Sequence, residues 1–217
     1  MIKHLDFINQ AHGLALKNFG KTFPNPSVGC IISKNNKIIS KGVTSSTGRP
    51  HAEEIALKKA GKKANGASMY VTLEPCFHNS QNGSCTDQIL RSGIKEIYIS
   101  CIDQDPRTKN KSISKLKRNK IKVVTGLEKN KTININKFFF KSLLKQQPFT
   151  KVKMAISSDE KIAWSNYKSK WITNAKSRSY VHKLRSNSQA ILTTSKTIIK
   201  DNPRFTVRNK NKIIKNL

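Results

Sequence analysis

Acidic residues are scarce in this sequence: 12 Asp and Glu stand against 42 Lys and Arg, a formal charge of +30 at pH 7. Such a basic excess is typical of nucleic-acid-binding proteins. Only 8 of the basic residues are Arg, however, the residue that favours planar, bidentate contacts, and only 7% of the chain is aromatic. We therefore expect non-specific attraction to polyanions and no dedicated nucleic-acid partner.

Long apolar runs are also absent. No run approaches the roughly 20 residues of a membrane span, and the first six residues lack the apolar core of a signal peptide. We therefore expect a cytoplasmic protein without a membrane partner. Of only four cysteines, Cys30 and Cys101 lie in apolar, strand-like runs and are expected to be inert. Cys76 and Cys85 follow a His-x-Glu sequence, which favours metal binding over a disulfide.

Hydrophobic spacing predicts alternating helices and strands over the first 145 residues. The predicted helices are 3–19, 51–64, 85–92, 111–119 and 136–145, and the predicted strands are 28–33, 37–40, 69–73, 97–102 and 121–125. This alternation predicts a three-layer α/β/α domain at 1–145, mostly parallel in its second half. After a linker, an incomplete unit at 149–217 is expected to contain strands at 151–157 and 190–192 and a helix near 173–188.

Asn25 stands between two prolines in Phe23-Pro24-Asn25-Pro26. Each proline fixes its own φ, so the segment is rigid. The pattern favours a tight turn between a helix and a strand. The alternative is that the rigid turn presents the Asn25 amide to a ligand.

His51, Glu53, Cys76 and Cys85 carry the strongest chemical signal. An imidazole and two thiolates occupy three positions of a tetrahedral zinc site and leave the fourth to water, whose pKa the metal lowers. Glu53 is then free to transfer protons, as in zinc deaminases with a His-x-Glu and Pro-Cys signature. The alternative is a structural zinc site with His78 as the fourth ligand. Motif order, the proline before Cys76 and both helix contexts favour the catalytic interpretation.

This region closely resembles the diaminohydroxyphosphoribosylaminopyrimidine deaminases of riboflavin biosynthesis, a bifunctional deaminase/reductase family. His51-Ala52-Glu53, the run 71–76 and the eight-residue gap to Cys85 carry the resemblance, since cytidine and transfer-RNA adenosine deaminases have two residues between their cysteines. It implies a cytidine-deaminase-like fold, one Zn²⁺ per chain and a homodimer or homotetramer. The implied reaction converts 2,5-diamino-6-ribosylamino-4(3H)-pyrimidinone 5′-phosphate to 5-amino-6-ribosylamino-uracil phosphate with release of ammonia. The resemblance assigns catalysis to Glu53, the metal to His51, Cys76 and Cys85, and substrate binding to Asn25 and His78.

In the second unit, the run Lys153-Met154-Ala155-Ile156-Ser157-x-Asp159 is followed in order by 169–173, His182 and Arg185, and 197–208. This order resembles the opening of the family's NADPH-dependent reductase domain, which is similar to dihydrofolate reductase. The resemblance assigns the dinucleotide to Ala155, Trp171, Thr197 and Asp201, and the reductase substrate to Ser169, Arg185 and Arg208. Thr194 and Lys196 replace the two glycines of the cofactor loop, where backbone must approach phosphate closely. The remaining strands of a dinucleotide fold are also missing. We predict a vestigial reductase without NADPH, alongside a separate reductase protein; a bifunctional deaminase/reductase is the alternative.

The first unit departs from the family pattern at two positions. Gln81 replaces a Lys that helps to hold the ribose phosphate, and Thr44 replaces a His. The loss of a cation should weaken phosphate binding and leave the metal and Glu53 untouched. A decaying, inactive copy therefore stays an alternative. A basic nucleic-acid-acting deaminase is another, and the long Cys76–Cys85 spacing argues against it.

Overall fold

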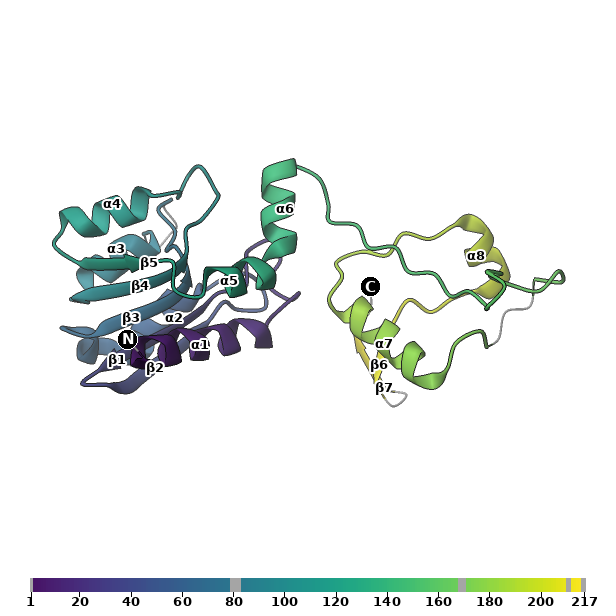
Figure 1. Ribbon diagram of the computed structural model, residues 1–217, viewed down its shortest axis with the longest axis horizontal. Coiled ribbons are helices and arrows are strands. Elements are labelled where there is room, and N and C mark those ends of the chain that lie inside the picture. The colour runs from purple at the N-terminus through teal and green to yellow at the C-terminus, as the bar shows by residue number, and fades with distance from the viewer. Residues whose placement is uncertain (1, 79–82, 168–170, 210–211, 216–217) are drawn as a thin grey trace. The chain divides into compact units, whose positions relative to one another are not determined.

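The computed structural model describes residues 2–78, 83–167, 171–209 and 212–215. Contacts within the chain divide it into two compact units, Met1–Phe149 and Thr150–Leu217 (Figure 1). In the described ranges, no helix combines the length and the apolar character that crossing a membrane requires.

A five-stranded mixed sheet in the order β2-β1-β3-β4-β5 forms the middle of the first unit. Its strands are β1 (Gly29–Lys34), β2 (Lys37–Val43), β3 (Ser68–Leu73), β4 (Glu96–Cys101) and β5 (Lys122–Thr125). β1 pairs antiparallel with β2 and β3, whereas the β3–β4 and β4–β5 pairs are parallel. The expected parallel second half is thus confirmed. Asn35 and Asn36, with φ of 51° and 58°, close the β1–β2 hairpin in the conformation that a two-residue turn needs.

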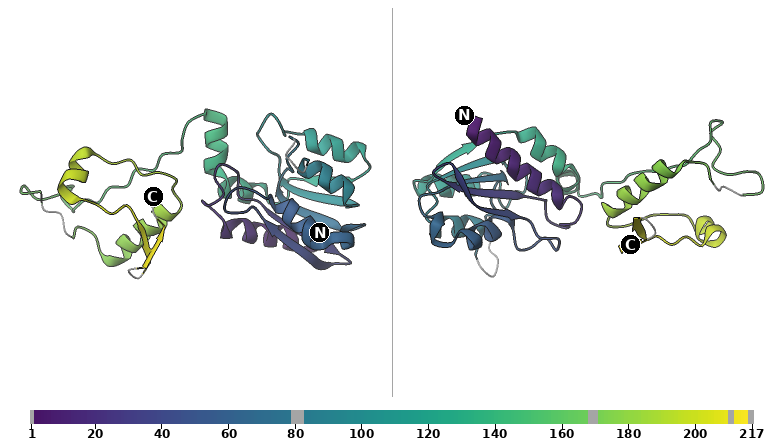
Figure 2. Two further views of the ribbon diagram at one scale, coloured as in Figure 1. Left: turned by 180° about the vertical axis from the view of Figure 1, so that it is seen from behind. Right: turned by 90° about the horizontal axis from the view of Figure 1, so that it is seen from below.

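Helices cover both faces of this sheet (Figures 1 and 2). One face carries α1 (Ile2–Lys17) and α5 (Lys129–Ile135); the other carries α2 (Ala52–Ala60), α3 (Cys85–Arg91) and α4 (Lys111–Arg118). A 3-10 turn (Gly61–Ala64) follows α2, and α6 (Lys137–Lys145) follows α5. Successive strand side chains point to opposite faces: Ile31 packs with Phe7 and Ile8 of α1, whereas Cys30 and Ile32 belong to the core under α2. The predicted three-layer α/β/α architecture is confirmed.

A buried polar network ties α1 and α5 to the sheet. His12 Nε2 lies 2.9 Å from Thr132 Oγ1 and 3.3 Å from Ser100 Oγ. Thr132 Oγ1 in turn lies 2.8 Å from the carbonyl oxygen of Thr72. Burial, reinforced by the charge of Lys131, lowers the pKa of His12 from 6.5 to about 4. The imidazole is therefore neutral in the folded unit at neutral pH.

We expect acid to destabilise the first unit through His12. Between pH 6.5 and about 4 the unfolded chain binds a proton that the folded unit does not, so stability falls as pH falls through this window. The shift corresponds to a loss of up to about 3 kcal/mol. The His12→Gln variant has no titrating group at this position, so its loss between pH 7 and pH 4 should be smaller by about that amount. Urea unfolding at the two pH values measures this difference.

Circular dichroism is the appropriate probe for that experiment, because both tryptophans of the chain, Trp164 and Trp171, lie in the second unit. Other titrating groups are common to both proteins and cancel in the comparison. If the two proteins lost the same free energy of unfolding between pH 7 and pH 4, the role assigned to His12 would be wrong.

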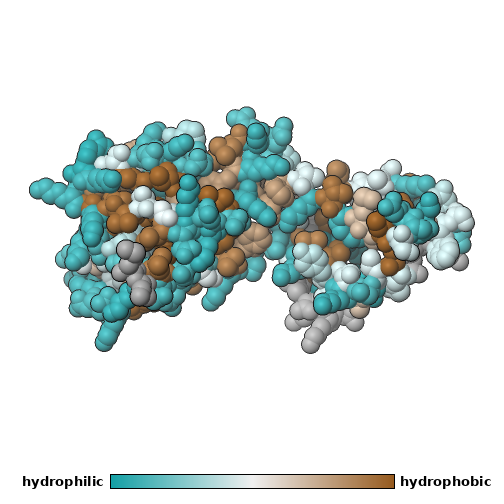
Figure 3. Space-filling model, viewed as in Figure 1, coloured by the Kyte–Doolittle hydropathy of each residue, from teal (hydrophilic) through white to brown (hydrophobic). Residues whose placement is uncertain are grey.

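The described part of the second unit contains two helices, α7 (Ala175–Ser186) and α8 (Ser195–Asp201), and one antiparallel pair of strands, β6 (Val207–Asn209) and β7 (Lys212–Lys215). The helix predicted near 173–188 is confirmed. The strands predicted at 151–157 and 190–192 are wrong: neither segment is a strand, because the described part of this unit offers them no strand partner. Among its described residues only Val207 is buried, and apolar side chains lie on its surface (Figure 3).

Candidate active site

Three predicted metal ligands meet beside the ends of β3, α2 and α3. His51 immediately precedes α2, Cys85 is the first residue of α3, and Cys76 lies in the turn after β3. Their ligand atoms all lie within 4.8 Å of one another. His51 Nδ1 is 3.3 Å from Cys85 Sγ, and the Cys85 backbone N–H donates to Cys76 Sγ at 3.3 Å.

Local hydrogen bonds fix the two helix starts that carry ligands. The backbone N–H of His51 donates to Glu54 Oε2 at 2.9 Å. Ser84 precedes α3, and its Oγ accepts the backbone N–H of Asp87 at 3.1 Å. These bonds satisfy backbone groups at or beside the helix starts and hold the ligands in place.

The two thiols differ in acidity. Hydrogen bonds with Cys85 and then with His51 lower the pKa of Cys76 to about 4, despite its burial. The hydrogen bond with Cys76, together with burial, raises the pKa of Cys85 above its ordinary value. Cys76 is therefore the more acidic of the two thiols. One nitrogen and two sulfur donors suit a soft divalent cation, which binds thiols in their deprotonated form.

The cluster has three protein ligands and no fourth among the described residues. No other His, Cys, Asp or Glu of the described chain joins His51, Cys76 and Cys85, and His78 is not part of the group. Structural zinc sites have four protein ligands, whereas catalytic sites keep one position open. The donor set fits zinc, and the geometry favours the catalytic interpretation over a structural site completed by His78.

Glu53 lies in the first turn of α2 and is only 3% exposed. Burial raises its pKa from 4.5 to about 7, while the charge of His51 opposes the rise and that of Cys76 adds to it. A carboxyl group with a pKa near the operating pH can both accept and return a proton. Glu53 follows the predicted ligand His51 by two residues at the start of α2, and its carboxyl group interacts electrostatically with His51 and Cys76.

A buried carboxylate that the sequence did not single out organises the neighbouring loop. Glu74 accepts hydrogen bonds from the backbone of Asp103 and Asn110, both at 3.2 Å, and from Ser112 Oγ at 2.9 Å. These bonds hold the β4–α4 loop against the turn that carries Cys76. Asp103 lies at the start of this loop, and burial raises its pKa to about 6. Asp103 could have been singled out from the sequence by its position just after a predicted strand, because ligands gather at the carboxyl ends of parallel strands.

Asn25 braces the segment that leads to His51. Its Nδ2 donates to the carbonyl oxygen of Gly48 at 2.8 Å, and its backbone N–H donates to Thr22 at 2.9 Å. Gly48 has a φ of 82°, and a Cβ there would lie 2.9 Å from Asn25 Nδ2. The structure thus provides the predicted turn, and binding of a substrate by Asn25 stays a prediction.

The two positions at which the first unit departs from the family pattern differ in what the structure shows. Thr44 is buried, and its Oγ1 accepts the backbone N–H of Val28 at 3.0 Å, which gives it a structural role. Gln81 lies outside the described residues. His78 is half-buried, and its Nδ1 is buried without a hydrogen-bond partner among the described residues.

In the second unit, the structure groups His182 with two arginines, Arg185 and Arg208. Arg208 donates its backbone N–H to His182 Nδ1 at 3.2 Å. Burial, and then the charge of Arg208, lower the pKa of Arg185. Such a pair is stabilised by an anion. Ser169 lies outside the described residues.

The predicted dinucleotide contacts have only local partners among the described residues, and their role in binding a dinucleotide stays a prediction. No hydrogen bond or ring contact connects Ala155, Trp171, Thr197 and Asp201 in the part of the chain that the structure describes. Trp171 is 71% exposed and stacks on the guanidinium of Arg178 at 4.2 Å. Thr197 donates its backbone N–H to Thr194 Oγ1 at 3.2 Å, a contact that begins α8.

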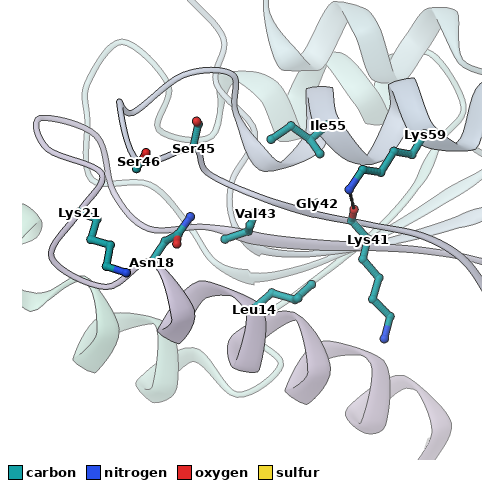
Figure 4. A pocket seen from close by; sticks show the side chains of 10 residues that line it. All are labelled: Leu14, Asn18, Lys21, Lys41, Gly42, Val43, Ser45, Ser46, Ile55 and Lys59. Carbon is teal, nitrogen blue, oxygen red and sulfur yellow. Dashed lines mark hydrogen bonds between the residues drawn. The ribbon is translucent and has the colours of Figure 1, made fainter. Parts of the chain in front are cut away.

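A separate cavity of about 580 Å³ lies between α1, β2 and α2 (Figure 4). Lysines and serines line it together with apolar side chains; they are Leu14, Asn18, Lys21, Lys41, Gly42, Val43, Ser45, Ser46, Ile55 and Lys59. None of the predicted metal, catalytic or substrate residues is among them. The chemistry of the metal cluster therefore does not extend into this cavity.

Two family models match the chain. Residues 1–101 match the cytidine and deoxycytidylate deaminase zinc-binding region, and residues 148–215 match the RibD C-terminal domain. The chain is 40% identical over 210 residues to riboflavin biosynthesis protein RibD of Aquifex aeolicus, covering 96% of this chain and 59% of that protein. It is 41% identical over 210 residues to RibD of Buchnera aphidicola subsp. Baizongia pistaciae, covering 97% of this chain and 56% of that protein.

A solved structure agrees with these sequence matches. A diaminohydroxyphosphoribosylaminopyrimidine deaminase/5-amino-6-(5-phosphoribosylamino)uracil reductase from Thermotoga maritima matches with a TM-score of 0.88 and 38% identity. The match covers 96% of this chain and 60% of that one. The chain thus spans less than two thirds of the length of these relatives.

Proposed function

The chain belongs to the RibD family of riboflavin biosynthesis, and we propose that its first unit is a zinc-dependent deaminase of that pathway. The proposed substrate is 2,5-diamino-6-ribosylamino-4(3H)-pyrimidinone 5′-phosphate, and the products are the corresponding aminouracil phosphate and ammonia. The observation that carries this proposal is the open group of His51, Cys76 and Cys85 with the buried Glu53 beside it.

The metal and Glu53 have separate roles in this hydrolysis. When bound, a zinc ion supplies the Lewis acidity that makes water nucleophilic at neutral pH. Glu53 accepts a proton from the attacking water and delivers it to the ring nitrogen. The hydroxyl on the ring carbon then gives its proton, through Glu53, to the amine; the C–N bond breaks, ammonia leaves and the carbonyl forms. The Glu53 pKa of about 7 makes both directions of transfer accessible. Burial of Glu53 limits proton exchange with bulk water.

An ammonia-release assay on this substrate, combined with a zinc count, tests the proposal. We expect one zinc per chain and release of ammonia that stops when a chelator removes the metal. A protein that retains one zinc per chain and releases no ammonia would refute the proposed reaction. Cytidine is a suitable comparison substrate, and we expect much slower release from it.

For the second unit we propose a vestigial reductase, and one observation favours the alternative of a working one. The Arg185–Arg208 pair offers a place for an anion such as a substrate phosphate. Against it, Thr194 caps α8 and the Lys196 amine lies 4.3 Å from the centre of the Tyr167 ring, so both cofactor-loop positions have local roles. NADPH oxidation assayed with the deaminated product decides between them, and we expect none.

A further inference from the structure

The β4–α4 loop holds a guanidinium group in a fixed orientation. Arg107 Nε lies 3.0 Å from both carboxylate oxygens of Asp105, and its Nη2 contacts Oδ2. Asp105 is itself only 5% exposed, and its backbone N–H donates to Asp103 Oδ1 at 3.0 Å. The Arg107 side chain is therefore anchored at one edge, unlike a freely rotating surface cation.

This loop lies directly against the turn that carries Cys76. The backbone N–H of Phe77, the next residue, donates to Thr108 Oγ1 at 3.4 Å. Asp105 and His78 interact electrostatically: the pKa of Asp105 is lowered mainly by Arg107, with a further contribution from His78. Arg107 thus belongs to a loop that contacts the segment after Cys76, and its partner Asp105 is electrostatically coupled to His78.

Arg107 retains hydrogen-bonding capacity after its contact with Asp105. A guanidinium group has five N–H donors. Asp105 uses the one on Nε and one on Nη2, which leaves three, and no residue of the described chain accepts them. The Arg107 side chain is 68% exposed, so these donors are accessible to a ligand. An oriented group with several free donors is suited to a phosphate.

The neighbouring cations are less suited to this task. Arg49 precedes His51 by two residues and pairs with Glu54 at 3.7 Å. Lys115 pairs with Asp87 at 2.6 Å, and its amine lies 5.6 Å from the centre of the Phe77 ring. A lysine amine is a point donor without the planar edge that Arg107 presents.

We propose that Arg107 binds the phosphate group of the deaminase substrate and that Asp105 is a positioning residue for it. This proposal rests on the proposed function, which supplies a phosphomonoester. Asp105 offsets part of the Arg107 charge, but the three remaining donors face a phosphate that is largely dianionic at neutral pH. The net charge of +30 adds a positive potential that attracts it.

The Arg107→Gln variant tests this assignment with two substrates, the phosphorylated pyrimidine and its dephosphorylated form. We expect kcat/KM for the phosphorylated substrate to fall roughly tenfold to a hundredfold, mostly through KM, because hydrogen bonds to charged groups are lost in both ground and transition states. For the dephosphorylated substrate, which lacks the group that Arg107 binds, the change should stay within about twofold. For the phosphorylated substrate, kcat/KM of Arg107→Lys should lie between that of the native protein and that of Arg107→Gln, since lysine keeps the charge and loses the paired edge.

Lys109→Gln is the matched control, because Lys109 is an exposed cation two residues away in the same loop. It makes the same change in net charge and should alter kcat/KM for neither substrate by more than about twofold. Equal losses on both substrates in Arg107→Gln, or an equal loss in Lys109→Gln, would overturn the assignment. The first result would indicate a general structural role, and the second a general effect of charge.

A binding experiment separates this proposal from the deaminase reaction itself. In zinc-loaded protein, NMR titration with ribose 5-phosphate should shift the Arg107 Nε–H signal, and titration with ribose should not. Backbone amide signals should report weaker binding of ribose 5-phosphate to Arg107→Gln. Equal affinity of the two proteins for ribose 5-phosphate would refute the role of Arg107. If neither substrate released ammonia, the proposed function would fail, and this titration would still decide the phosphate site.

Discussion

Glu53→Gln is expected to retain zinc and to lose roughly 10³-fold or more of kcat, in the upper range of general acid–base contributions. The introduced glutamine has nearly the shape of the native side chain and cannot carry a proton at neutral pH. The native side chain is 3% exposed, and water does not readily replace its function. Ammonia release measures kcat, and metal analysis measures the zinc content.

The neighbouring Glu54 provides the matched control. Glu54→Gln makes the same chemical change one residue along α2, where the native carboxylate accepts the His51 backbone N–H and pairs with Arg49. The amide oxygen of Gln can still accept that hydrogen bond, so we expect less than about a tenfold loss of activity. If Glu53→Gln kept more than about a tenth of the native activity, the proton transfer would have to be assigned to another group.

The elements of the first unit could largely be predicted because their hydrophobic periodicity agrees with their tertiary packing. β1 is a short continuous apolar run, typical of a strand buried on both faces, and its Ile31 packs on one face while Cys30 and Ile32 pack on the other. The helix α5 was not predicted, because Lys-Asn-Lys-Thr-Ile-Asn-Ile is rich in residues with weak helix propensity. Its Thr132 and Ile135 are buried, so packing against α1 and the sheet stabilises it.

The second unit shows the limit of local patterns. The β-branched and apolar residues near 151–157 and 190–192 suit a strand, but a strand also needs a partner for its N–H and C=O groups. In the described part of this unit the only paired strands are β6 and β7. A local pattern cannot show whether a partner strand exists. This is why these two predictions were wrong while the helix near 173–188 was confirmed.

The candidate site could also be predicted only in part. The spacing of His51, Cys76 and Cys85 predicts a metal cluster, and the structure brings their ligand atoms together. Glu74 and Arg107 could not be assigned from spacing, because their roles depend on contacts made across the fold. Glu74 reaches Asp103, Asn110 and Ser112 between 29 and 38 residues away.

The second large effect is expected from the metal ligands themselves. Cys85→Ser replaces a thiol by a hydroxyl, which does not ionise near neutral pH and is a poor zinc ligand. We expect zinc content well below one per chain and no measurable ammonia release, in contrast to Glu53→Gln, which retains the metal. His51→Ala, which removes the only nitrogen of the cluster, should behave in the same way.

Cys101→Ser is the control for a buried cysteine that is not a ligand. Cys101 is 2% exposed at the end of β4 and is not part of the cluster, so this variant should keep one zinc per chain at some cost in stability. Chelation supplies a second readout that is independent of activity: removal of zinc should lower the Tm of the native protein and of Cys101→Ser but leave that of Cys85→Ser unchanged. Stoichiometric zinc in Cys85→Ser, with a Tm that still responds to chelation, would show that the metal has other ligands.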